Sequence, residues 1–354
     1  MSPGLELAAG FYAEVVGHLV RVPHAAALLG EGSDVLGYDD ARSADHAWGP
    51  RLIIFVDHEE VGLVRRAIDA GLPQAYRGHQ VRFFAWQDRT VRHHVEVVTV
   101  ADWLREQLGA LPDKLQPAHW LGLPQQRLPQ VTAGAVFHDD AGQLSEARRA
   151  LAWYPRDVWL WLMASQWRII ADQEPLPGRT SEAGDQRGTR LALTNLARSA
   201  MQLCFLQERR YWPYTKWFSM AFSELDAAQE LGADLDRLLG SSNPAQGIAA
   251  LVTVLEHLAG RQNNLQIAHA LDPRCRPFEV GINQAVRPYL VLNAARFAQA
   301  CAEQIGDSRL RRLPTVGGID QLTHAGDLLV NFTSWPTALI KVYEQQLNIT
   351  GESS

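Results

Sequence analysis

The segment GEGSDVLGYDDARSADHAWGPRL, residues 30–52, places four aspartates, one glutamate and one histidine between two apolar runs. The run AAALLG, residues 25–30, precedes it, and the β-branched run LIIFV, residues 52–56, follows it. Glycine lets a backbone turn tightly and approach a ligand closely, and a serine hydroxyl with successive amides can bind phosphate oxygens. The pair Gly32–Ser33 therefore predicts a phosphate-binding turn, with an ordinary charged loop as the alternative.

Two acidic residues are placed to meet at such a turn. Asp45 comes twelve residues after Ser33, just before the LIIFV run. Glu96 lies between Val95 and Val97 in a second strand-like run, where alternation turns its side chain to the face opposite the two valines. Because carboxylates from adjacent strands can hold a hard divalent cation, these two residues predict a metal site.

The first half of the chain alternates helix and strand patterns. We expect Asp57 and Glu60 to cap the helix that begins after LIIFV, and Gly71 to end it. Interleaved elements of this kind favour a mixed sheet with helices packed on it. The expected helices span residues 5–20, 58–70 and 101–109, and the expected strands span residues 52–56, 80–86, 91–100 and 131–142.

From about residue 145 the strand patterns end and helical spacing takes over. Trp159, Met163, Trp167 and Ile170 share one face of a predicted helix and are expected in a core. The sequence thus predicts a mixed-sheet α/β (α+β) domain over residues 1–144 and an all-α domain over residues 145–354. The expected helices of the second half span residues 156–173, 189–210, 216–232, 245–260 and 287–306, with a loop over residues 174–188.

Composition excludes several classes of protein. The chain carries 33 lysines and arginines against 39 aspartates and glutamates, a net charge of -6, and no basic run, so we expect no long nucleic-acid partner. No apolar run reaches the roughly 20 residues that span a bilayer, and the N-terminus lacks the pattern of a signal peptide. Cys204, Cys275 and Cys301 are scattered without zinc spacing, which fits a reducing compartment. These features favour a cytoplasmic protein without a membrane partner.

The order of these motifs resembles the DNA polymerase β-like nucleotidyltransferase superfamily, in which a GS turn is followed by acids on two neighbouring strands. An α/β half followed by a helical half is similar to the layout of its antibiotic and small-molecule nucleotidyltransferases. More narrowly, GSDVLGYDD and DHAWGPR, the segment GDQRG at residues 184–188 and YWPYTKW at residues 211–217 resemble an uncharacterised bacterial family. That family carries a nucleotidyltransferase-like domain of unknown function, and the resemblance runs over most of the chain.

The resemblance implies a reaction and a set of site residues. Gly32 and Ser33 would hold the triphosphate of a nucleotide, expected to be ATP. Asp45 would ligate Mg²⁺ or Mn²⁺, and Glu96 would ligate the metal or take a proton from the acceptor. The nucleoside monophosphate group would then pass to a hydroxyl of a small molecule or protein, with release of pyrophosphate.

One position departs from the superfamily pattern. The acidic pair is expected as acid, any residue, acid, whereas this chain reads Asp45, His46, Ala47. His46 could replace the missing ligand, or Asp39 or Asp40 could fold back into the site. If none of them does, the alternative is a catalytically degenerate nucleotide-binding, regulatory or antitoxin-like interaction module.

Lys216 is the residue of the helical half that we single out. It follows Pro213 near an expected helix start, where its ammonium group could reach triphosphate oxygens. The alternative is a solvated lysine among packed aromatic side chains.

Overall fold

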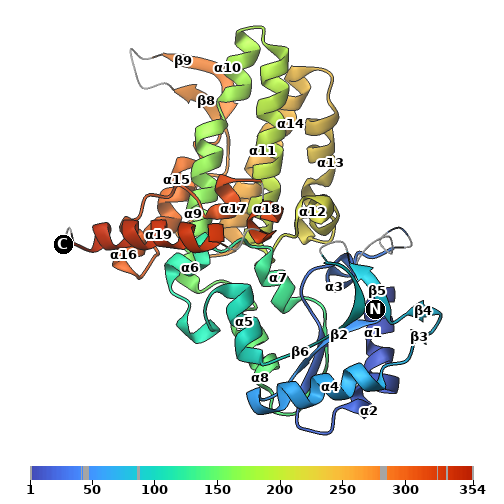
Figure 1. Ribbon diagram of the computed structural model, residues 1–354. Helices are drawn as coiled ribbons and strands as arrows, with labels where there is room; N and C mark the ends of the chain where they lie inside the picture. The colour runs from blue at the N-terminus through green and yellow to red at the C-terminus, as the bar shows by residue number, and fades with distance from the viewer. Residues whose placement is uncertain are drawn as a thin grey trace. The chain divides into compact units, whose positions relative to one another are not determined.

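The computed structural model describes residues 2–40, 42, 48–85, 88–279, 285–324, 326–331 and 334–352, and it contains two compact units (Figure 1). Unit 1 comprises Met1–Gln116 and Gln125–Ala152, and unit 2 comprises Pro117–Pro124 and Trp153–Ser354. The boundary predicted after residue 144 stays a prediction; that position falls inside helix α8 (Gln143–Ala150).

Unit 1 is built on a five-stranded sheet of order β5-β6-β2-β1-β7. Strands β2 and β6 run parallel, whereas the other neighbours are antiparallel, so the sheet is mixed, as the interleaved patterns predict. Two residues on each side of a tight turn form the small β3–β4 pair. The strands are β1 (Ala25–Leu28), β2 (Arg51–Phe55), β3 (Ala75–Tyr76), β4 (His79–Gln80), β5 (Arg82–Ala85), β6 (Asp88–Val98) and β7 (Ala135–Asp139).

Helices cover the sheet of unit 1. On one face, Leu52 and Ile54 of β2 and Val95 and Val97 of β6 join a buried cluster with side chains of α1 and α4. On the other face Phe55 packs edge-on against Trp103 of α5, with ring centroids 5.6 Å apart. The helical segments are α1 (Pro3–Phe11), η1 (Tyr12–Val16), α2 (Gly17–Leu19), α3 (Ser33–Leu36), η3 (His58–Glu60), α4 (Val61–Gly71), α5 (Val100–Leu108), η4 (Pro112–Lys114), α7 (Arg127–Thr132) and α8.

The predicted end of α4 at Gly71 is confirmed, but the predicted cap at its start is wrong. Asp57 occupies the N-cap position of the short η3 segment, and its side chain makes no capping hydrogen bond there. Asp57 keeps an extended backbone, and the helical turns before α4 begin at His58.

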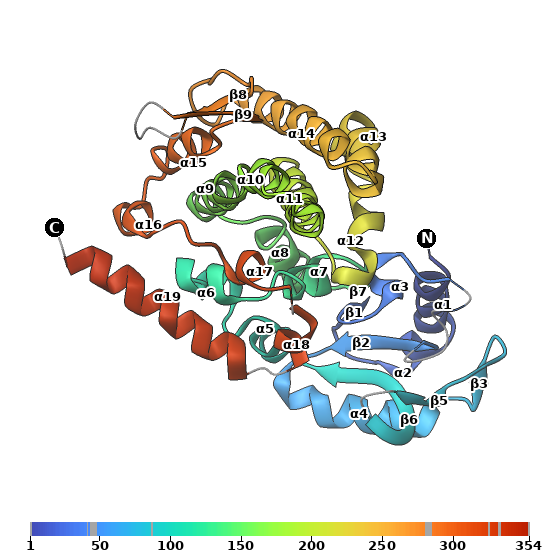
Figure 2. The same ribbon diagram turned by 90° about the horizontal axis from the view of Figure 1, so that it is seen from above.

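Unit 2 is largely helical. In Figure 2, helices α12 to α15 form an arc around α9, α10 and α11. Trp159, Met163, Trp167 and Ile170 are all buried, which confirms the predicted core face of α9. The helices are α6 (Pro117–Gly122), α9 (Arg156–Gln173), α10 (Leu176–Glu182), α11 (Gln186–Gln207), α12 (Thr215–Phe222), α13 (Asp226–Gly240), α14 (Pro244–Asn264), α15 (Ala295–Ala302), α16 (Ser308–Arg312), α17 (Ile319–Leu322), α18 (Gly326–Asn331) and α19 (Ser334–Glu352).

Two expectations for the second half are wrong. The segment expected as a loop contains helix α10, because prolines at its start are compatible with the first helical turn. The start of the expected helix 287–306 is instead strand β9 (Val286–Val291), which pairs with β8 (Arg276–Glu279). Pro288 disfavours a helix there, and the ring of Tyr289 lies against Gly178 of α10 so closely that a Cβ would overlap it. The hairpin thus depends on a contact between residues more than 100 positions apart.

Among the described residues, no helix combines the length and the apolar character that crossing a membrane requires.

A buried ion pair joins the turn after β1 to the start of β2. The Asp34 side chain of α3 is 4% exposed. Its carboxylate accepts hydrogen bonds from Nε (3.1 Å) and Nη2 (2.6 Å) of Arg51, the first residue of β2. The same Nη2 donates to the backbone oxygen of Glu31 at 2.8 Å. Because a two-pronged guanidinium contact has a single geometry, this pair sets the position of residues 31–34 against the start of β2.

We predict that Arg51→Met lowers the free energy of unfolding by about 3 kcal/mol, because it leaves the buried Asp34 carboxylate without its partner. Urea denaturation of Asp34→Asn, Arg51→Met and the double variant measures the coupling between them. The double variant should lose clearly less stability than the sum of the two single losses.

Arg77→Met is the matched control, since it removes an arginine from the ion pair with Glu14, in which both side chains are more than half exposed. The stability of this variant should stay close to that of the wild type. If the stability loss of the Asp34→Asn, Arg51→Met double variant equals the sum of the two single losses, the two residues are not energetically coupled.

Candidate functional site

Gly32 and Ser33 form the turn that leads from β1 into α3. Gly32 has φ +140° and ψ 148°, a backbone conformation that L side chains rarely adopt. A Cβ at this position would overlap Oδ1 of Asp34 and Nη2 of Arg51. Glycine is therefore required both for the backbone and for the close approach of the ion pair, and Ser33 is held at the first position of α3.

The strand register places Glu96 opposite the middle of β2, on the face of the sheet that carries Arg51. Because β2 and β6 are parallel, Arg51 lies opposite His94 and Ile53 lies opposite Glu96. Alternation places Arg51, His94 and Glu96 on one face, opposite the face that carries Leu52. Arg51 also reaches the turn through the oxygen of Glu31, so the turn and the start of β2 form one region, with His94 of β6 opposite Arg51.

Glu96 is electrostatically unfavourable as an anion. Its side chain keeps an exposed surface, yet the protein atoms around it desolvate it and raise its pKa. The negative charge of Glu106 on α5 raises the pKa further, while Arg92 and Arg65 act in the opposite direction. A nearby cation would stabilise the charged form of this carboxylate.

Arg127 of α7 lies within electrostatic range of two acidic residues of unit 1, Glu31 and Glu106. Its Nη1 donates to Oε1 of Gln107 at 2.9 Å and to Oε1 of Gln130 at 3.2 Å. Burial lowers the pKa of Arg127, while the charges of Glu31 and Glu106 raise it. The guanidinium therefore lies within electrostatic range of both the turn and α5.

The structure describes only some of the residues that were expected to complete the metal site. Asp45 and His46 lie outside the described residues, so their roles stay predictions. Asp39 accepts hydrogen bonds at Oδ2 from the amide of Gly4 (2.7 Å) and from the indole of Trp48 (3.1 Å). These contacts attach the segment after α3 to α1, which is a structural role.

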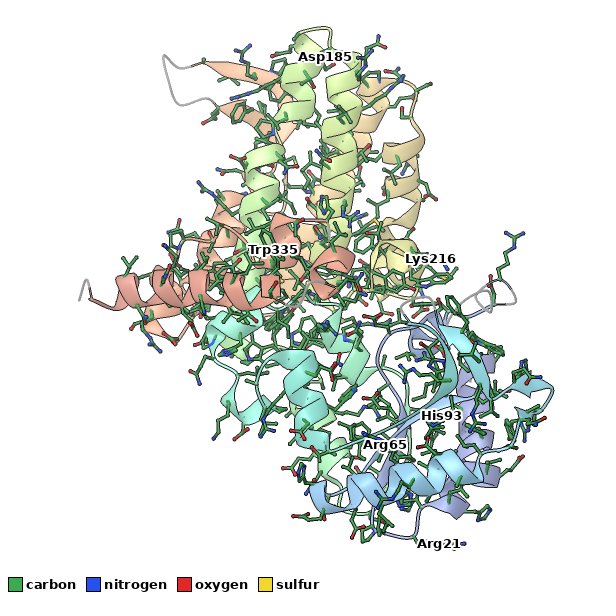
Figure 3. All side chains as sticks on the ribbon, in the orientation of Figure 1. Arg21, Arg65, His93, Asp185, Lys216 and Trp335 are labelled. Atoms are coloured by element: carbon green, nitrogen blue, oxygen red, sulfur yellow. The ribbon has the colours of Figure 1, made fainter. Side chains whose placement is uncertain are left out.

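Lys216 belongs to unit 2, where it is the second residue of α12. Its ammonium group is exposed and lies 4.6 Å from the ring centroid of Trp217. Figure 3 shows Lys216 and Asp185 towards opposite ends of the helical unit, and Asp185 caps α11 through the amide of Gly188 at 2.8 Å. An approach of Lys216 to the Gly32–Ser33 turn stays a prediction.

Arg51, Glu106 and Arg127 were not singled out from the sequence. Arg51 is separated from Asp34 by 17 positions and Arg127 from Gln107 by 20, so only the fold makes them neighbours. One local feature of the sequence does indicate Arg51: it stands at the start of the LIIFV strand, where a positive charge that points into the protein would need a partner of opposite charge.

The chain matches a protein-family model described as "Domain of unknown function (DUF4037)" over residues 120–218. The match contains the segments GDQRG and YWPYTKW but not the Gly32–Ser33 turn. No curated protein matches the chain. Among solved structures, the chain is similar to a nucleotidyltransferase-like protein from Exiguobacterium sibiricum 255-15, with 12% identity, a TM-score of 0.30 and coverage of 78% of this chain and 82% of that one.

Proposed function

We propose that the protein is a metal-dependent nucleotidyltransferase that moves a nucleoside monophosphate group from a triphosphate, ATP in the first instance, to a hydroxyl of a small molecule or protein. Pyrophosphate is the second product. The observations that carry the proposal are the glycine-dependent turn ending in Ser33 and the desolvated Glu96, which belongs to the same sheet on a strand separated from β1 by β2.

The Gly32–Ser33 turn would bind the phosphate groups. Gly32 adds no side chain of its own to the turn and adopts a positive φ, and the Ser33 hydroxyl adds a donor. Arg51 neutralises the buried Asp34 carboxylate, so that its negative charge does not repel phosphate oxygens. Lys216 would add a positive charge from the helical unit.

Glu96 and Asp45 would ligate the metal, and His46 would replace the absent second acid. Glu96 fits this role because the carboxylate lies beside Glu106 and is desolvated, so that a divalent cation would relieve an existing electrostatic cost. Bound Mg²⁺ or Mn²⁺ would polarise the α-phosphate and stabilise the charge on the leaving pyrophosphate. Alternatively, a Glu96 that does not ligate the metal would keep its raised pKa and be suited to take the proton of the attacking hydroxyl.

The acceptor is expected to be small or a protein side chain. A net charge of -6 and the acidic groups around the turn would repel a long polyanion.

A second function is favoured by one observation. Ala47 stands where the superfamily has its second acid, and alanine cannot ligate a metal. A site that binds nucleotide without transfer would make the protein a regulatory or antitoxin-like interaction module.

We predict that Glu96→Gln raises the melting temperature of the metal-free protein at neutral pH by about 1–2 °C, since it removes an unfavourable charge. A carboxyl whose folded-state pKa is raised destabilises the fold once the unfolded chain ionises. The gain should therefore vanish below about pH 4, where the unfolded chain is also protonated.

Differential scanning fluorimetry at several pH values, with and without Mg²⁺, measures this effect. Mg²⁺ should stabilise the wild type and leave Glu96→Gln unchanged. A lower melting temperature for Glu96→Gln at every pH would contradict the electrostatic account of Glu96.

We predict that incubation with Mg²⁺ or Mn²⁺, α-labelled ATP and a pool of small hydroxyl compounds moves label onto an acceptor and releases pyrophosphate. Asp45→Asn should abolish transfer, because it removes the ligand charge at nearly constant volume. If His46 replaces the missing acid, His46→Ala should reduce transfer comparably.

Asp57→Asn is the matched control: it changes an acid at the other end of β2 and should retain wild-type transfer. ATP binding without transfer to any acceptor under either metal would reject the enzyme and favour the interaction module.

A further inference from the structure

A histidine-rich cluster lies at the end of the sheet opposite the Gly32–Ser33 turn. His24 directly precedes β1, His138 lies in β7, and Asp140 follows β7. One potential ligand atom from each of the three residues lies within 4.8 Å of the other two. The antiparallel β1–β7 pairing, in which Ala25 faces Asp139, brings them together.

Hydrogen bonds orient the three side chains. Nδ1 of His24 lies 2.8 Å from the carbonyl oxygen of Val22, which can only accept, so this nitrogen carries the proton and Nε2 keeps its lone pair. The hydroxyl of Tyr12, 2.9 Å away, donates to that lone pair, so a metal ion at Nε2 would have to displace this hydrogen bond. A backbone carbonyl that receives the second ring nitrogen is the usual support for a metal-ligating histidine.

The other two residues are equally well placed. Nε2 of His138 lies 2.8 Å from Oδ1 of Asp140, and Oδ2 of Asp140 accepts the His24 amide at 2.9 Å. The two imidazole rings lie 4.6 Å apart between centroids, at 32°. These contacts thus restrain the orientations of the two imidazoles and the carboxylate.

A pocket of about 440 Å³ adjoins the cluster and lies wholly within unit 1. His24 and Asp140 line it, and so do Asp57, Asp102 and Asp139. Arg105 also lines the pocket and pairs with Asp102, so the other three aspartates leave an excess of negative charge that would attract cations.

We propose that His24, His138 and Asp140 form a binding site for a divalent transition-metal ion of the zinc class, separate from the site proposed for Mg²⁺. Imidazole ligands select such ions over Mg²⁺, which prefers oxygen. A tetrahedral ion bound at about 2.0–2.1 Å holds its ligand atoms about 3.3 Å apart, so the three side chains need to shift by roughly 1 Å. Three protein ligands leave the fourth position to water or to an oxygen ligand from the pocket.

Metal analysis tests the proposal directly. The full-length protein is stripped with chelator, incubated with Zn²⁺ in the presence of excess Mg²⁺, and desalted before elemental analysis. The wild type should retain about one zinc ion per chain. His138→Gln and Asp140→Asn should each lower zinc affinity at least tenfold, with circular dichroism spectra like that of the wild type.

Two controls isolate the site. His257→Gln changes an exposed histidine of α14, and Glu96→Gln changes the Mg²⁺ site, so both should retain zinc as the wild type does. Co²⁺ substituted for zinc should give d–d absorption without a thiolate charge-transfer band, because the three ligands provide only nitrogen and oxygen.

Absence of retained zinc in the wild type would overturn the proposal, as would equal retention by His138→Gln and Asp140→Asn or a thiolate band with Co²⁺. These results do not depend on nucleotide binding. The experiment therefore tests the zinc site independently of the proposed transferase activity.

Discussion

The contact on which unit 1 depends is the buried pair of Asp34 and Arg51. It joins the turn after β1 to the first residue of β2, and its guanidinium also holds the backbone oxygen of Glu31. A carboxylate that is 4% exposed would be unstable without a partner of opposite charge. The pair therefore requires Gly32, whose Cβ would overlap both of its members, and it determines the conformation in which Ser33 is presented.

The sheet has two chemically different ends. At one end, β1 leads into the Gly32–Ser33 turn, for which we propose a bound phosphate and an oxygen-ligated cation. At the other end, His24 precedes β1 and Asp140 follows β7, so that two imidazoles and a carboxylate lie together. Because the antiparallel β1 connects the two ends, one short strand of four residues, AAAL, positions both. Its small, buried side chains allow helices to approach both faces closely.

Local patterns predicted much of this architecture. The strand at LIIFV, the helix before Pro23, the buried face of α9 and the turn at Gly32 all follow from spacing or from the properties of one residue type. Contacts between distant residues were not predictable in this way: the partner of Asp34 is Arg51, Arg127 reaches Gln107, and Tyr289 packs on Gly178. The histidine cluster was missed for the same reason, because 114 positions separate His24 from His138 and only strand pairing joins them. Asp45 and His46 remain known from the sequence alone.

The most direct test of the central claim is calorimetric titration of ATP into protein freed of transition metals, once with excess Mg²⁺ and once with EDTA. The account predicts saturable binding with Mg²⁺, loss of that binding in EDTA, and an affinity at least tenfold weaker for Ser33→Ala, since a hydrogen bond to a charged group contributes about 1.5–3 kcal/mol. Ser33→Ala should have the melting temperature of the wild type. Equal ATP affinity in Mg²⁺ and EDTA would contradict a metal-bridged triphosphate site at this end of the sheet.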